Sequence, residues 1–155
     1  MPLPRLDPDG TTLLARKAAM RDVPAVMALI THWARQGAML AKSREALYTS
    51  IRDYHVLEAD DGSVAASVAL HVLWHDLAEV RSLAVHPDFK GKGLGRQMVL
   101  SVEREARELG ITRLFAWTLE PEFFERCGYT RITLDELPPK VWKDYHKAAM
   151  LKALA

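Results

Sequence analysis

Three things are scarce in this sequence: cysteine, net charge and long apolar runs. Its 155 residues include one cysteine, Cys127, and carry a formal net charge of +1. One cysteine can form neither an internal disulfide nor a multi-cysteine metal site. A nearly neutral chain has no basic excess to neutralise phosphates, which argues against a nucleic-acid-binding protein. No apolar run approaches the roughly 20 residues that span a bilayer, so we expect no membrane segment.

The length and the two ends of the chain predict its organisation. The N-terminal segment MPLPRLDPDG has no apolar core of the secretory type, so we expect no signal peptide and a cytoplasmic protein. A length of 155 residues suits one domain, expected over residues 1–155, with residues 1–10 flexible. Pro138 and Pro139 set off residues 138–155, whose helical spacing predicts an amphipathic tail packed on the domain or on a partner subunit.

Apolar periodicity and turn residues predict alternating strands and helices. Expected strands cover residues 12–17, 54–58, 64–74, 78–85, 113–118 and 129–133. Expected helices follow the N-cap candidates Asp22 and Ser43, or cover residues 96–109 and 121–126. Hairpin-linked strands come first, and a strand–helix–strand crossover follows. This order predicts an α/β (α+β) fold with a mixed central sheet of about six to seven strands flanked by helices.

The segment HPDFKGKGLGRQM, residues 86–98, joins an expected strand to the next helix and contains three closely spaced glycines. The first N–H groups of a helix have no intrahelical partner, and glycines allow a phosphate to approach them closely. The spacing fits neither a Walker loop nor the GxGxxG dinucleotide fingerprint. A glycine-rich turn alone is more often plain loop punctuation, so the surrounding residues decide its meaning.

Those surroundings resemble the GCN5-related N-acetyltransferase (GNAT) family. EVRSLAVHPDFKGKGLGRQM and FFERCGY are similar to family motifs, with lysine at the first position of the signature Gln/Arg-x-x-Gly-x-Gly/Ala. The resemblance implies the GNAT fold and acetyl-CoA as co-substrate, without a metal. It implies that pantetheine and the acetyl carbonyl contact the backbone of Leu83, Ala84 and Val85. The pyrophosphate would contact the loop and helix start, which comprise Lys90, Gly91, Lys92, Gly93, Leu94, Gly95 and Arg96.

A longer set of matches narrows the resemblance. MLAKSREAL, EVRSLAV, FFERCGY and LPPKVWKDY are similar to the acetyltransferase domain of bacterial N-acetylglutamate synthases. Those enzymes acetylate the α-amine of glutamate and begin arginine biosynthesis. The sequence resembles their short, stand-alone kind, so we do not expect arginine feedback through an amino-acid-kinase-like domain. Because the family often forms dimers, we expect a homodimer.

Two residues are the expected catalytic groups. Glu79 lies on the strand where the family commonly places its general base, and strand alternation would put Glu79, Arg81, Leu83 and Val85 on one face. An ion pair of Glu79 with Arg81 or with a neighbouring strand is the alternative. Phe124 occupies the position of the family's usual tyrosine acid and is assigned here to cofactor binding. Thr118 then becomes the candidate acid, with capping of the helix at 121 and protonation by water as alternatives.

Substrate binding is assigned to cations, because glutamate carries two carboxylates. Lys42 lies where the relatives usually have arginine, next to Ser43, and Arg81 is the second candidate. Lysine offers a point charge, whereas arginine can form two parallel hydrogen bonds to one carboxylate. The lysine therefore weakens the assignment to glutamate. Two other functions therefore stay open: a GNAT enzyme for another small amine or a protein N-terminus, and a non-catalytic acyl-CoA-binding sensor.

Overall fold

A computed structural model describes residues 4–6, 12–142 and 147–154 of the chain. The helices are α1 (Val23–Arg35), α2 (Arg44–Ser50), α3 (Leu94–Leu109) and α4 (Pro121–Arg126), with 3₁₀ turns at Met20–Asp22, Ile51–Asp53, Pro87–Phe89, Leu134–Glu136 and Pro139–Val141. The strands are β1 (Pro4–Leu6), β2 (Thr12–Lys17), β3 (Tyr54–Ala59), β4 (Val64–Trp74), β5 (Leu77–Val85), β6 (Arg113–Thr118), β7 (Thr130–Ile132) and β8 (Ala148–Ala153).

All these strands belong to one mixed sheet, in the order β1-β2-β3-β4-β5-β6-β8-β7. Strands β1 to β5 are joined as antiparallel neighbours, and the turn at Asp60-Asp61-Gly62 connects β3 to β4 as expected. Strand β6 is parallel to β5, and α3 forms the crossover between them. The predicted α/β fold with a mixed sheet and flanking helices is confirmed.

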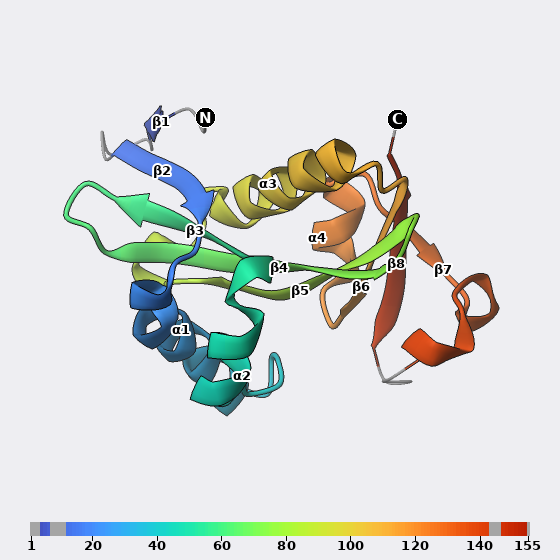
Figure 1. Cartoon of the computed structure of the whole chain (residues 1–155), viewed down its shortest axis with the longest axis horizontal. Coiled ribbons are helices and arrows are strands. Elements are labelled where there is room, and N and C mark those ends of the chain that lie inside the picture. Colours follow the sequence, from blue (N-terminus) through green and yellow to red (C-terminus); the bar gives the residue numbers. More distant parts are fainter. Residues whose placement is uncertain (1–3, 7–11, 143–146, 155) are drawn as a thin grey trace.

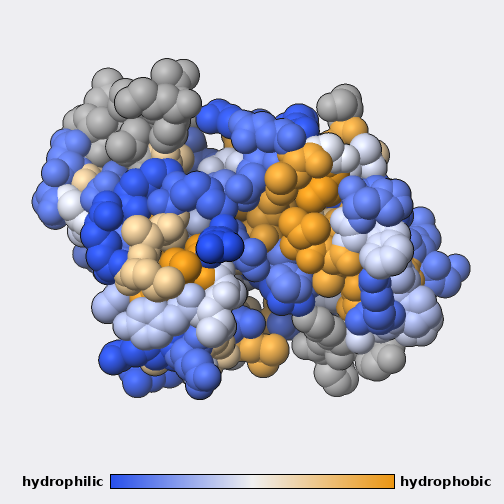
Figure 2. Space-filling view, in the orientation of Figure 1, coloured by the Kyte–Doolittle hydropathy of each residue, from blue (hydrophilic) through white to orange (hydrophobic). Residues whose placement is uncertain are grey.

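Helices cover both faces of the sheet, as Figure 1 shows. Helices α3 and α4 pack on one face over a core that includes Leu70, Val80, Met98 and Phe124. Helices α1 and α2 pack on the other face over Tyr54, Val56, Ala69 and their neighbours. On the face shown in Figure 2, apolar residues gather below the C-terminal half of α3. The large exposed apolar side chains of α3 and β4 are Leu100, Leu109, Val72 and Trp74.

The two ends of the chain differ from the prediction. The expected amphipathic helical tail contains a strand instead, because Ala148–Ala153 pairs along the whole of β6 and also with β7. Residues 149–151 of this strand pair with β6 on one side and with β7 on the other, and a helical backbone could not form these two ladders. At the other end, Pro4–Leu6 forms β1 against β2, so this part of the expected flexible segment is paired. The rest of residues 1–10 lies outside the described residues.

The first helix is not capped as expected. The Asp22 backbone is already helical and its side chain makes no cap bond to α1. Its carboxylate instead accepts bonds from the Ala19 N–H at 2.7 Å and from both terminal nitrogens of Arg16 at 2.8 Å. Arg16 also donates to Glu58 from its Nε at 3.0 Å. This buried network fixes the turn before α1 to strands β2 and β3. Ser43, in contrast, caps α2 as predicted, accepting from the Ala46 N–H at 3.1 Å.

Asp22→Asn is expected to reduce the free energy of unfolding at pH 7 by about 2 kcal/mol, the scale of a hydrogen bond to a charged group. The bonds from Arg16 lower the pKa of Asp22, even though burial raises it. The Asp22 carboxylate therefore stabilises the folded protein at pH values above the pKa of an unfolded aspartate, about 4. This contribution is lost as the pH falls through the lower pKa that Asp22 has in the folded protein. Urea unfolding at pH 7 and at pH 3 checks both statements.

The exposed residue Asp88 supplies the control. Asp88→Asn should leave stability at pH 7 within about 0.5 kcal/mol of the parent, as for most surface substitutions. An Asp22→Asn protein that is as stable as the parent at pH 7 would contradict the assignment.

Candidate active site

Strands β5 and β6 pair over a short stretch and then separate. Their parallel ladder starts with Leu77 beside Arg113 and ends with Glu79 beside Phe115. Past that point the described ladder joins β5 only to β4, and β6 only to β8. A gap therefore opens in the middle of the sheet, and Glu79 lies at its closed end with 6% of its surface exposed.

A bulge in β5 changes which side chains share a face. Ala69 pairs with Arg81, but Ser67 pairs with Ala84, so β5 holds one extra residue between the two pairs. Ser82 has a φ of +54°, a left-handed conformation that is uncommon for a residue other than glycine. The expected common face of Glu79, Arg81, Leu83 and Val85 is therefore wrong. Strand alternation could not reveal the extra residue.

The side chains separate into two groups about this bulge. Glu79 and Arg81 lie on the face covered by α1 and α2, since directly paired residues share a face and Ala69 belongs to that core. Leu83 and Val85 pack into the core beneath α3. The base candidate thus points to one side of the sheet, and the apolar residues after the bulge point to the other.

Backbone direction distinguishes Val85 from Ala84. The His86 N–H donates to the Ala65 carbonyl at 2.8 Å, which makes Val85 and Ala66 a non-hydrogen-bonded pair. The N–H and C=O of Val85 therefore face the gap beside β6. The backbone groups of Ala84 face β4 instead, because successive residues of a strand alternate. Of these two predicted contacts to a ligand in the gap, the backbone direction favours Val85.

Helix α3 begins directly after the glycine loop and at the same end of the gap. Gly91 and Gly93 have φ values of +82° and +79°, and no atom lies within 4 Å of a Cβ built on either. The first intrahelical bond of this helix runs from the Gln97 N–H to the Gly93 carbonyl. The N–H groups of Leu94, Gly95 and Arg96, which precede it, have no carbonyl in the preceding turn to bond to. Space over the glycines and three amides at a helix N-terminus fit the pyrophosphate of a CoA thioester.

Two neighbouring phenylalanines of α4 lie in different surroundings. The predicted cofactor residue Phe124 is 5% exposed and packs edge-to-face against Tyr129 in the core. Its neighbour Phe123 is half-buried, and its ring lies 3.1 Å from a Cβ built on Gly95. Phe123 therefore borders the start of α3, where Gly95 leaves room for its ring. Sequence reasoning missed this residue, because the family pattern marks position 124 and gives no signal for the one before it.

Glu79 and Arg81 form an ion pair, the alternative considered from the sequence. The Arg81 Nε donates to Glu79 Oε1 at 2.8 Å. His71 is the cross-strand partner of Glu79 on β4, and its Nδ1 lies 3.3 Å from Asp53 Oδ2. The base candidate thus has a cation and an imidazole as neighbours on the α1–α2 face. Among the residues that the structure describes, no group of three or more His, Cys, Asp or Glu side chains is arranged to hold a metal.

Thr118 ends β6 on the opposite side of the gap from the second half of β5. Its Oγ1 accepts a bond from the Glu120 N–H at 2.8 Å, so the hydroxyl closes the turn that leads into α4. This turn precedes α4 and does not cap it, because the N-cap of α4 is Glu120 and no side chain bonds there as a cap. A hydroxyl that accepts one bond keeps its own hydrogen for donation, so this contact is compatible with proton donation.

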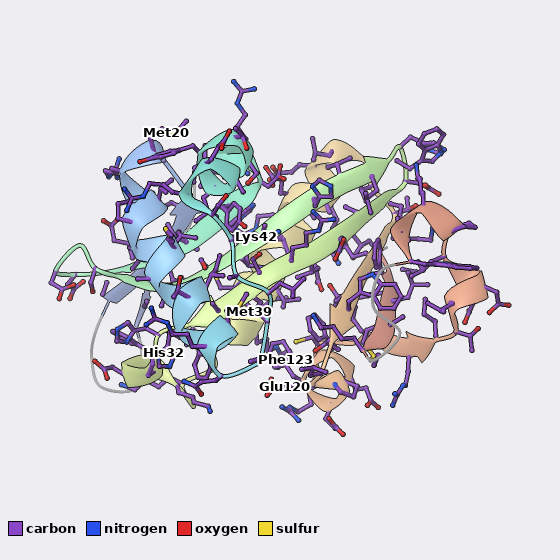
Figure 3. The ribbon with its side chains drawn as sticks, turned by 90° about the horizontal axis from the view of Figure 1, so that it is seen from below. Met20, His32, Met39, Lys42, Glu120 and Phe123 are labelled. Atoms are coloured by element: carbon purple, nitrogen blue, oxygen red, sulfur yellow. The ribbon has the colours of Figure 1, made fainter. Side chains whose placement is uncertain are left out.

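The acceptor-side candidates belong to the connection between α1 and α2. Figure 3 views the molecule from the side of these helices and shows the connection crossing over the sheet, with Met39 and Lys42 on it. Lys42 is half-buried, and the described residues supply it with no hydrogen-bond or ion-pair partner. Ser43 follows as the cap of α2, which fixes the end of the connection. Lys42 and Arg81 thus lie on the same face of the sheet.

Comparison with known proteins agrees with this geometry. A family model described as "Acetyltransferase (GNAT) family" matches residues 25–129, more than half of the chain. The chain belongs to the GNAT acetyltransferase family. As a GNAT enzyme it depends on acetyl-CoA, and the gap and the α3 N-terminus described above fit that co-substrate.

Relatives of this GNAT enzyme include proteins of similar length and much longer ones. An "Amino-acid acetyltransferase" of Mycobacterium tuberculosis is 40% identical over 121 residues, covering 77% of this chain and 69% of the relative. One of Actinobacillus pleuropneumoniae is 30% identical over 140 residues, covering 90% of this chain but 32% of the relative. The chain thus spans about a third of such longer relatives.

A solved structure of "N-acetylglutamate synthase from Neisseria gonorrhoeae complexed with coenzyme A and N-acetyl-glutamate" superimposes with a TM-score of 0.87 at 32% identity. The match covers 92% of this GNAT chain and 35% of that chain. A Mycobacterium tuberculosis protein in complex with CoA superimposes with a TM-score of 0.82, also at 32% identity, over 91% of this chain and 99% of that one.

Proposed function

We propose that this enzyme transfers the acetyl group of acetyl-CoA to the α-amino group of L-glutamate, giving N-acetylglutamate for arginine biosynthesis. The observation that carries the proposal is the position of Glu79 at the closed end of the β5–β6 gap, beside Arg81 on the α1–α2 face. The names and ligands of the relatives favour an amino acid, and glutamate in particular, as the acceptor.

The thioester is proposed to lie in the gap, with its pyrophosphate on the amides of Leu94, Gly95 and Arg96. Lys90 and Lys92 would add positive charge beside these donors. The N–H of Val85 would donate to the pantetheine arm, and Leu83 beside the bulge would donate to the thioester oxygen. A donor aimed at that oxygen stabilises the negative charge that develops there in the transition state.

The acceptor amine is proposed to approach from the α1–α2 face, where Glu79 takes its proton. The free amine nitrogen then bonds to the thioester carbon, the carbonyl oxygen becomes an oxyanion, and collapse of this tetrahedral intermediate breaks the C–S bond. The amine keeps the acetyl group and gives its second proton to water. The thiolate leaves and takes a proton either from water or from the Thr118 hydroxyl, which water then reprotonates.

Cations on the same face would hold the carboxylates of the acceptor. Arg81 already pairs with Glu79, so it would hold the base and one carboxylate together. Lys42 would bind the other carboxylate as a point charge. These two cations argue against a polyamine or another cationic acceptor, since like charges at close range repel.

An acetyl-transfer assay with a panel of amines tests the proposal. Thiol release from acetyl-CoA is measured with glutamate, aspartate, glutamine, lysine and a peptide with a free N-terminus. Glutamate is expected to give the highest kcat/KM. Release with another amine and none with glutamate would overturn the assignment to glutamate, and tight acetyl-CoA binding without release on any amine would indicate the sensor function instead.

Lys42→Met is expected to raise the KM for glutamate about tenfold or more with little change in kcat, because a hydrogen bond to a charged group is worth about 1.5–3 kcal/mol. Lys42→Arg keeps the charge and should recover most of the affinity. Steady-state kinetics with glutamate varied at saturating acetyl-CoA provide the measurement. An unchanged KM in Lys42→Met would exclude the residue from acceptor binding.

The single-domain organisation, the homodimer and the cytoplasmic location stay predictions. The exposed apolar side chains of α3 and β4 provide apolar area that a second copy could bury. The described helices include none that is long and apolar enough to cross a membrane.

A further inference from the structure

Trp33 is a half-buried residue near the end of α1 that the family motifs do not mark. Its indole Nε1–H donates to the carbonyl of Val85 at 2.8 Å. That carbonyl is one of the two Val85 backbone groups that face the β5–β6 gap. The indole therefore occupies the acceptor at this point of the gap and leaves the Val85 N–H as the group offered to a ligand. A ligand group opposite Val85 must then accept a hydrogen bond, as an amide carbonyl does.

The same indole contacts the donor loop. The Lys90 Nζ lies over its ring at 5.3 Å from the centroid, in the geometry of a cation–π interaction. Trp33 thus touches both parts of the proposed acetyl-CoA site, the end of β5 and the glycine loop. Trp33 makes both contacts from α1, which lies on the acceptor face of the sheet.

The backbone of Trp33 begins the connection that carries Lys42. Its carbonyl accepts from the N–H of Gln36 at 3.1 Å and from the N–H of Ala38 at 3.0 Å. The turn after α1 is therefore hydrogen-bonded to Trp33, and the side chain of Trp33 contacts Val85 and Lys90 of the donor site. Trp33 is thus one residue with contacts both to the donor site and to the start of the acceptor-side connection.

We propose that Trp33 is a positioning residue that couples the two substrate sites: it sets the affinity for acetyl-CoA, and bound acetyl-CoA orders residues 36–43 through it. This inference rests on the proposed use of the β5–β6 gap by acetyl-CoA.

Trp33→Phe removes the N–H and keeps an aromatic ring for Lys90. The loss of one hydrogen bond is expected to raise the Kd of acetyl-CoA about fivefold. In the parent, acetyl-CoA is expected to slow amide hydrogen exchange in residues 36–43, and in Trp33→Phe this slowing is expected to be lost. Trp74→Phe is the matched control, since Trp74 is 59% exposed at the far end of β4, and both effects should match the parent.

Calorimetry and hydrogen exchange distinguish the outcomes. A parent protein that does not bind acetyl-CoA overturns the proposed function itself. A parent that binds, with Trp33→Phe unchanged in Kd and in exchange protection, overturns the role of Trp33 and leaves the function intact. Protection that persists in Trp33→Phe despite weaker binding overturns the coupling. If Trp33→Phe does not fold, replacing the indole by benzothiophene, an isostere without the N–H, supports the same two measurements.

Discussion

Glu79→Gln lowers kcat about 100-fold or more if this carboxylate removes the amine proton, the usual scale for the loss of a general base. The amide keeps the size of the side chain and its place beside Arg81 but accepts no proton. The ionisation of the base should also disappear from the pH dependence of kcat/KM, so the activity that is left should follow only the other groups. Steady-state rates measured from pH 5 to pH 9 provide both readouts.

Glu108→Gln is a suitable control, because Glu108 is exposed at the far end of α3 from the gap. It removes the same charge and should leave kcat and its pH dependence unchanged. The base assignment fails if Glu79→Gln keeps the parent's pH profile. A fall in kcat with an unaltered profile would instead mean that Glu79 acts by holding Arg81.

Gly93→Ala is expected to raise the Kd of acetyl-CoA tenfold or more. A methyl group at position 93 meets no protein atom within 4 Å. A loss of affinity would therefore come from a clash between this methyl group and the ligand, which must approach the loop closely. The left-handed backbone at +79° adds a stability cost of about 1–2 kcal/mol for a residue with a Cβ. Calorimetry measures the affinity, and thermal unfolding measures the stability.

The other end of the same helix provides a closely matched control. Gly110 has a φ of +81° and no atom within 4 Å of a built Cβ, but it lies at the C-cap of α3. Gly110→Ala should cost the same stability as Gly93→Ala and leave the affinity for acetyl-CoA unchanged. Equal losses of affinity in the two variants would place the donor elsewhere.

The elements that the sequence predicted well are those with local signals. Alternation and turn residues marked β4 and β6 at their observed bounds, and Gly110 ended α3 where its left-handed conformation ends it in the structure. The loop from Lys90 to Arg96 was also marked, because glycines before an amphipathic helix are visible in the sequence.

The features that the sequence did not reveal depend on residues far apart in the chain. The extra residue at Ser82 appears only when β5 is aligned against β4, and it changes the face of every later side chain on β5. The tail has the spacing of a helix, yet the open edges of β6 and β7 pair with it as a strand. The contact of Trp33 with Val85 joins residues 52 positions apart, which no local pattern records.

The position of β8 has a consequence for how the chain is made. Strand β8 follows β6 and β7 in the sequence but lies between them in the sheet, so both neighbours are synthesised before the strand that joins them. Until Ala148–Ala153 emerges from the ribosome, β6 presents an unpaired edge beside the gap and β7 has no partner. The sheet that holds Thr118 is therefore completed only when β8 pairs with β6. A chain without β8 would expose an aggregation-prone edge on β6, so loss of this strand would cost both solubility and catalysis.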